Sequence, residues 1–85
     1  MHPATILHIN TRNGMFVIKH DDHAYCVLEL YDSIDIAVGD RIRCEINALG
    51  SHEAFHCGEG QTFTVIGQSG ECGLHAALRL AGLVV

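Results

Sequence analysis

This 85-residue chain has little positive charge for its length. Five lysines and arginines stand against ten aspartates and glutamates, which gives a formal net charge of −5 with histidine neutral. Affinity for nucleic acids comes largely from neutralising phosphates with lysine and arginine, so a basic surface spread over the whole protein is excluded. Seven histidines add positive charge as the pH falls through roughly 6.5, which makes the net charge sensitive to pH.

Long apolar runs are also missing. Every apolar stretch is far shorter than the roughly 18 residues that a membrane-spanning helix needs. Met1-His2-Pro3 carries no basic region and no apolar run follows it, which argues against a secretory signal. We therefore expect a cytoplasmic protein without membrane contact. In that reducing compartment the four cysteines are expected to be free thiols, with Cys26 and Cys44 packed as small apolar residues.

Motifs that carry catalysis are not found. Gly67-Gln-Ser-Gly70 does not match the Gly-x-Ser-x-Gly turn of hydrolases, and Gly58-Glu59-Gly60 lacks the lysine and the helix of a phosphate-binding loop. The His20-Asp-Asp-His23 turn is interpreted as solvated turn polarity. We expect a binding module with no catalytic residue, no metal and no cofactor. A zinc site remains an alternative for five residues that have the right chemistry but no Cys-x-x-Cys pair: His52, His56, Cys57, Cys72 and His75.

What the chain does have is a series of short segments in which apolar and polar residues alternate. This alternation predicts five strands, at residues 5–10, 15–20, 25–31, 41–47 and 61–66. Asn13-Gly14 suits a tight hairpin turn, and residues 48–60 are predicted to be a long loop. We predict an all-β fold in one domain, residues 1–85: a five-stranded antiparallel barrel over about residues 5–67, followed by a C-terminal segment.

That C-terminal segment, about residues 71–85, has apolar residues at helical spacing. We predict a short helix that covers one open end of the barrel, begins near Ser69 or Glu71 and ends at Gly82. Leu83-Val84-Val85 leaves an apolar terminus. The alternative is that this tail contacts a protein partner or a second copy of the chain, because an exposed apolar end needs a cover.

Period-two alternation sorts the strand residues into two faces. The residues expected to point inward are Leu7, Ile9, Phe16, Ile18, Cys26, Leu28, Leu30, Ile42, Cys44, Ile46, Phe63 and Val65. The residues expected to point outward are Met15, Val17, Lys19, Tyr25, Val27, Glu29, Tyr31, Arg41 and Arg43. The outward set is more apolar than solubility requires, so it is a candidate binding face.

Two strands and one connection resemble known barrels. The phrase Val38-Gly39-Asp40-Arg41-Ile42 after an extended crossing is similar to the oligonucleotide-binding fold (OB-fold), especially the cold-shock domain. That family has Lys-Gly-Phe-Gly-Phe-Ile on the second strand and Val-Phe-Val-His-Phe on the third, whose aromatic rings stack on single-stranded bases. Here Asn13-Gly14-Met15-Phe16-Val17-Ile18 and Ala24-Tyr25-Cys26-Val27-Leu28 occupy these places. Gly14, Ile18 and Tyr25 fit the pattern, whereas Met15 and Val17 replace both aromatic residues of the first run.

The resemblance, over roughly residues 5–67, implies a module that binds single-stranded RNA or DNA. The predicted nucleic-acid-binding residues are Arg12, Met15, Val17, Lys19, Tyr25, Arg41 and Arg43. Since most stacking rings are replaced, we expect binding to be weak, salt-sensitive and not sequence-selective. The alternative is a protein-interaction or self-associating module without a nucleic-acid role, which would use the Met15, Val17 and Tyr25 face or the apolar tail.

Overall fold

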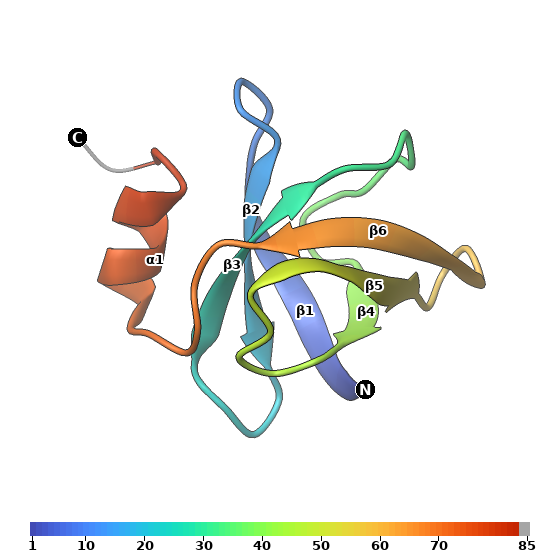
Figure 1. Cartoon of the computed structure of the whole chain (residues 1–85), viewed down its shortest axis with the longest axis horizontal. Helices are drawn as coiled ribbons and strands as arrows, with labels where there is room; N and C mark the ends of the chain where they lie inside the picture. Colours follow the sequence, from blue (N-terminus) through green and yellow to red (C-terminus); the bar gives the residue numbers. More distant parts are fainter. Residues whose placement is uncertain (84–85) are drawn as a thin grey trace.

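The computed structural model describes residues 1–83 of the chain. Within these residues the chain forms six strands and one short helix, connected by turns and one extended crossing (Figure 1). The elements are β1 (His2–Asn10), β2 (Met15–His20), β3 (Tyr25–Leu30), β4 (Arg41–Cys44), β5 (Gly50–His56), β6 (Gln61–Gly67) and α1 (Leu74–Leu80). No helix within residues 1–83 has the length and apolar character needed to cross a membrane.

The strands form one closed ring in the order β1-β2-β3-β6-β5-β4, with β4 pairing back onto β1. The chain makes two three-stranded meanders, β1-β2-β3 and β4-β5-β6, and the outer strands of one pair with those of the other. All six pairings are antiparallel. Closure removes the free edges on which sheets otherwise aggregate.

The prediction of mostly β structure with a short C-terminal helix is confirmed, but the structure has six strands where five were predicted. The additional strand is β5, which lies inside the segment predicted to be a loop, residues 48–60. It pairs with β6 from Gly50 opposite Gly67 to His56 opposite Gln61. Its inward positions include Ala54, which lies opposite Phe63 so that a small side chain faces a large one.

The first strand corrects the predicted alternation. β1 begins at His2 and carries an irregularity between Ile6 and His8, where one extra residue shifts the pairing with β2. A β-bulge of this kind changes the phase of the side chains that follow it. Ile6, before the bulge, is fully buried, and Ile9, after it, packs against the same core. Leu7, predicted to point inward, is only half-buried and lies outside that cluster.

The interior of the ring holds most of the predicted core. Its buried residues are Ala4, Ile6, Phe16, Ile18, Cys26, Leu28, Ile42, Cys44, Ala54, Phe63 and Val65. Leu30 packs partly against them, as do Ile34 and Ile36 from the crossing between β3 and β4. The fourth strand ends at Cys44 instead of Asn47, and Ile46 is half-buried beyond it. Gly14 has a φ of 77° in the β1–β2 turn, in agreement with the predicted tight turn.

The helix does not cover an open end of the ring. It packs on the outer surface of β2 and β3, where Ala77 and Ala81 meet Val17 and Val27 in a second buried cluster. Figure 1 shows α1 beside these strands. The predicted helix end at Gly82 is confirmed, but the residue before the first turn is Gly73, not Ser69 or Glu71. Of the apolar terminus, Val84 and Val85 lie outside the described residues.

Candidate functional site

The apolar part of the predicted binding face lies under the helix. Val17 and Val27 are fully buried, so the expectation that they are exposed is wrong. Met15 and Tyr25 are half-buried against the same cluster. The backbone of Tyr25 also exchanges two hydrogen bonds with Cys72, at 3.1 and 2.9 Å, which fixes the segment before α1 to β3. The excess of apolar residues on this face is therefore explained by a helix of the same chain.

The basic residues of the predicted site lie in two places. Lys19 and Arg41 are both directly opposite Thr5 on β1, one from β2 and one from β4, so they share one row of the outer surface. Arg43 lies two residues further along β4, opposite Pro3. Arg12 is in the β1–β2 turn at the other end of β2 and does not join them. The structure thus gathers three of the four predicted basic side chains.

Two of these three cations already have protein partners. Arg41 donates to both carboxylate oxygens of Asp21, at 2.7 and 2.8 Å, and to the hydroxyl of Thr5 at 2.7 Å. The hydrogen bond from Arg41 lowers the pKa of Asp21, and the same contact raises the pKa of Arg41. The Nζ of Lys19 donates to the carbonyl oxygens of His20 and His23. Arg43 is exposed and has no ion-pair partner among residues 1–83.

A hollow opens at the end of the ring that carries the β1–β2 turn. We call it the end groove; it has a volume of about 260 Å³. It is lined by Ile9, Asn10, Thr11, Gly14, Leu30, Ile34, Asp35 and Ile36. Four of these side chains are aliphatic and one is a carboxylate. Sequence reasoning missed the groove because its walls come from three separate segments, and the only signal was a pair of isoleucines in the polar crossing.

A histidine and an aspartate join the crossing to β5. The Nε2 of His56 donates to Asp40 at 2.8 Å, and Nδ1 accepts the backbone N–H of Glu59 at 3.0 Å. The hydrogen bond from His56 lowers the pKa of Asp40, whose carboxylate also accepts the N–H of Ala37 at 2.8 Å. Because both ring nitrogens of His56 are engaged within the protein, this pair stabilises the crossing and has no nitrogen left for proton transfer to a substrate.

The residues considered for zinc do not come together. Within residues 1–83, no three His, Cys, Asp or Glu side chains lie close enough to share a metal ion as they stand. Cys57 is exposed, Cys72 is half-buried beside Tyr25, and His75 is exposed on α1. All four cysteines are free thiols, and Cys26 and Cys44 are buried as predicted. Burial raises the pKa of the Cys44 thiol to about 12, so it remains protonated at neutral pH.

Comparisons with known proteins do not add a family to these observations. No protein-family model, no curated protein and no solved structure matches the chain. Its function is therefore argued from its own geometry.

Proposed function

We propose that this protein is a small, non-enzymatic binding module that takes up an aliphatic side chain of a partner protein in the end groove. The observation that carries this proposal is the groove itself: Ile9, Leu30, Ile34 and Ile36 line a hollow that residues 1–83 leave unfilled. Pockets for drug-sized ligands commonly have volumes of about 300–1,000 Å³. A groove of about 260 Å³ suits a group of side-chain size.

The charge of the protein and the topology of its sheet indicate which kind of partner fits the end groove. Asp35 lies at the groove, and the chain carries a net charge of −5, so a basic residue next to the aliphatic one is favoured. Every strand in the ring has a neighbour on both sides, which disfavours binding by addition of a strand. The proposed ligand is therefore a peptide segment with an aliphatic residue beside an arginine or lysine, recognised through its side chains.

Single-stranded nucleic acid is the second candidate. The observation that favours it is that β4 presents Arg41 and Arg43 outward, next to Lys19 on the same surface. In this proposal the ring acts as an OB-like barrel that uses phosphate contacts without base stacking, since α1 covers Val17 and Val27. The Asp21 carboxylate beside Arg41 and the negative net charge oppose it. Binding would be weak and would decrease steeply with salt.

A titration followed by nuclear magnetic resonance separates the two candidates. The probes are acetyl-leucyl-arginine amide, acetyl-leucyl-glutamate amide and a short oligothymidine, each added to the full chain at low salt. We expect the arginine dipeptide to shift the methyl signals of Ile9, Leu30, Ile34 and Ile36, and to do so more strongly than the glutamate dipeptide. Asp35→Lys should reverse this preference, because it reverses the charge beside the groove.

The control is Glu53→Lys, the same charge change at an exposed position of β5 away from the groove lining. It should leave the preference for the arginine dipeptide unchanged. If neither dipeptide shifts the groove signals, the proposed function is wrong. Shifts on β4 with oligothymidine that disappear in Arg43→Glu would support the nucleic-acid candidate instead.

A further inference from the structure

Three histidines meet at the end of the ring opposite the end groove. His2 from β1, His20 from the end of β2 and His23 from the β2–β3 turn line a small cleft together with Pro3, Asp21 and Asp22. We call it the histidine cleft; its volume is about 40 Å³. A cavity needs roughly 10–15 Å³ to admit one water molecule, so the histidine cleft has room for a single ion or water and little more.

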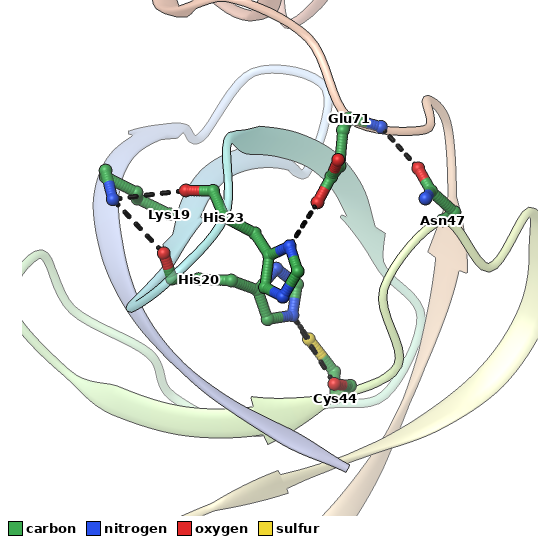
Figure 2. Close-up of polar contacts among 6 residues, drawn as sticks. All are labelled: Lys19, His20, His23, Cys44, Asn47 and Glu71. Atoms are coloured by element: carbon green, nitrogen blue, oxygen red, sulfur yellow. Dashed lines mark hydrogen bonds and ion pairs between the residues drawn. The ribbon is translucent and has the colours of Figure 1, made fainter.

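His20 lines this cleft and has a buried ring nitrogen that nothing among residues 1–83 satisfies. Its side chain is fully buried, and its Nε2 lies 3.4 Å from both the carbonyl oxygen and the Sγ of Cys44, as Figure 2 shows. A carbonyl oxygen can only accept a hydrogen bond, so in the tautomer that donates from Nε2 to Cys44 the lone pair is on Nδ1. That Nδ1 is buried and has no hydrogen-bond partner within the described residues, 1–83. A buried nitrogen without a partner is unfavourable unless a ligand satisfies it.

His23 has the same arrangement with a carboxylate. Its Nδ1 lies 2.9 Å from Glu71, which therefore accepts the proton on Nδ1 and leaves the lone pair on Nε2. Glu71 is held in place, because its backbone N–H donates to the side chain of Asn47 at 2.6 Å. Figure 2 shows this chain of contacts, together with Lys19, which fixes the turn by donating to the carbonyl oxygens of His20 and His23.

This pattern is the one found around metal-ligating histidines. Such residues donate one ring N–H to a carboxylate or a backbone carbonyl, which fixes the tautomer and directs the other nitrogen to the metal. Here His23 uses a carboxylate and His20 uses a carbonyl.

We propose that the histidine cleft binds one divalent transition-metal ion of the zinc, copper and nickel class through His20 Nδ1, His23 Nε2 and the ring of His2. Imidazole nitrogens suit these metals, and three of them leave a fourth position for water or a nearby carboxylate. Asp21 is held by Arg41, so Asp22 is the freer carboxylate at the cleft.

The ligands must close slightly to reach the ion. The ring of His2 lies 6.4 Å from that of His20 and 6.1 Å from that of His23, measured between ring centres. With Zn–N bonds of about 2.0–2.1 Å in a tetrahedral site, two such ring centres are about 5 Å apart. His2 and His23 are exposed and can rotate toward the buried His20 by this amount. This rearrangement is required, because no three such side chains among residues 1–83 are placed to hold a metal ion as they stand.

Zinc titration of the untagged, chelator-treated full chain tests the proposal. We expect saturable one-to-one binding, measured by competition with a chromophoric chelator, and shifts of the ring proton signals of His2, His20 and His23. Cobalt substitution should give the visible spectrum of a four-coordinate ion. His23→Gln should weaken zinc binding strongly, and Glu71→Gln should weaken it by about 10–100-fold, because it removes the acceptor that orients His23.

A matched control is His75→Gln, since His75 is exposed on α1 and does not line the cleft. It should bind zinc like the unmodified chain. Absence of one-to-one binding, or equal affinities of His23→Gln and His75→Gln, would overturn the proposal. Because His20 is buried, His20→Gln tests the proposal only if that variant folds. His23→Gln and Glu71→Gln change exposed positions, so the conclusion does not depend on the folding of His20→Gln.

Discussion

Gly67 is a residue at which two segments approach each other closely. It ends β6, pairs with Gly50 and Leu28, and is buried against the backbone of Ala48. A Cβ at this position would overlap the carbonyl oxygen of Ala48, a backbone atom that cannot rotate away. We therefore predict that Gly67→Ala lowers the free energy of unfolding by about 2–4 kcal/mol. Chemical denaturation followed by circular dichroism measures the change.

Gly73 provides the control for that substitution. A Cβ on Gly73 would meet no heavy atom within 4 Å, and its φ of −74° is open to any residue. Because Gly73 is the N-cap of α1, where Ala is less favourable than Gly, Gly73→Ala should lower the free energy of unfolding by no more than about 1 kcal/mol. Equal stability of the two variants would show that the chain relaxes around Gly67 and that the close approach is not a constraint.

Histidine is the residue type whose environment the sequence predicted least well. The His20-Asp-Asp-His23 motif reads as a solvated turn, and Asp21, Asp22 and His23 are indeed exposed. His20 continues the inward phase of Phe16 and Ile18, so alternation alone places it on the inward side, and it is fully buried opposite Ala4 of β1 and beside Cys44 of β4. His56 is buried in the same way, two residues after Ala54, and hydrogen-bonds to Asp40, sixteen residues away in the chain. Alternation thus places a histidine inside the ring, whereas long-range contacts decide which partners its ring meets.

At the scale of elements, the packing of α1 on β2 and β3 decides which surface is available for binding. Ala77 is fully buried against Val17 and Val27, whereas Ala76, the preceding residue, is exposed. Ala77→Asp places a carboxylate without a partner between these side chains. We predict that the variant loses about 3 kcal/mol of stability or releases the helix and exposes the valines. Binding of a hydrophobic dye and hydrogen exchange of Val17 and Val27 measure the release.

The matched variant is Ala76→Asp, which puts the same charge on the exposed side of the same helix. It should bind no more dye than the unmodified protein and should keep the slow exchange of Val17 and Val27. Dye binding that is equal in both variants would contradict the described packing. If Ala77→Asp releases the helix and the variant then binds oligothymidine, α1 masks the nucleic-acid face predicted from Met15, Val17 and Tyr25.

The number of strands illustrates what local pattern can and cannot give. β2 agrees with its predicted bounds, and β3 and β6 differ from theirs by one residue, because their apolar residues alternate clearly. β5 was missed since two of its inward positions hold Ala54 and His56, which do not read as an apolar face. The predicted number of strands would have shown that one was missing. Neighbours in an antiparallel ring alternate in direction, so such a ring closes only with an even number of strands.

At the scale of the whole molecule, the two ends of the ring have opposite character. One end holds the aliphatic end groove, and the other holds the histidine cleft with four carboxylates nearby, namely Asp21, Asp22, Glu45 and Glu71. The ring between them has a continuous core and no open edge. The sequence predicted the core and most strands, but neither end, because each end is assembled from turns that are distant in the chain. Because the two sites lie at opposite ends of the ring, peptide binding at the end groove and the acid sensitivity of His20 can be tested independently.

The stability of the whole protein should decrease with acid in two separate steps. Burial lowers the pKa of His20 from 6.5, while the nearby His2 and His23 lower it further and Glu71 and the Cys44 carbonyl oppose the shift. The unfolded chain therefore binds this proton more readily than the folded protein. The contribution of His20 is complete above pH 6.5 and is lost as the pH falls from there toward the folded-state pKa.

The second step comes from two carboxylates. Hydrogen bonds from His56 to Asp40 and from Arg41 to Asp21 lower both pKa values from 3.8, so their stabilisation is present above pH 3.8 and is lost as the pH falls through the folded-state values. Denaturation of the metal-free protein between pH 8 and about pH 2 should show both steps. His20→Gln should flatten only the step that starts near pH 6.5, and Asp40→Asn should reduce only the lower one. Because His75 is exposed, His75→Gln should keep both; an upper step that survives in His20→Gln would assign it to another histidine.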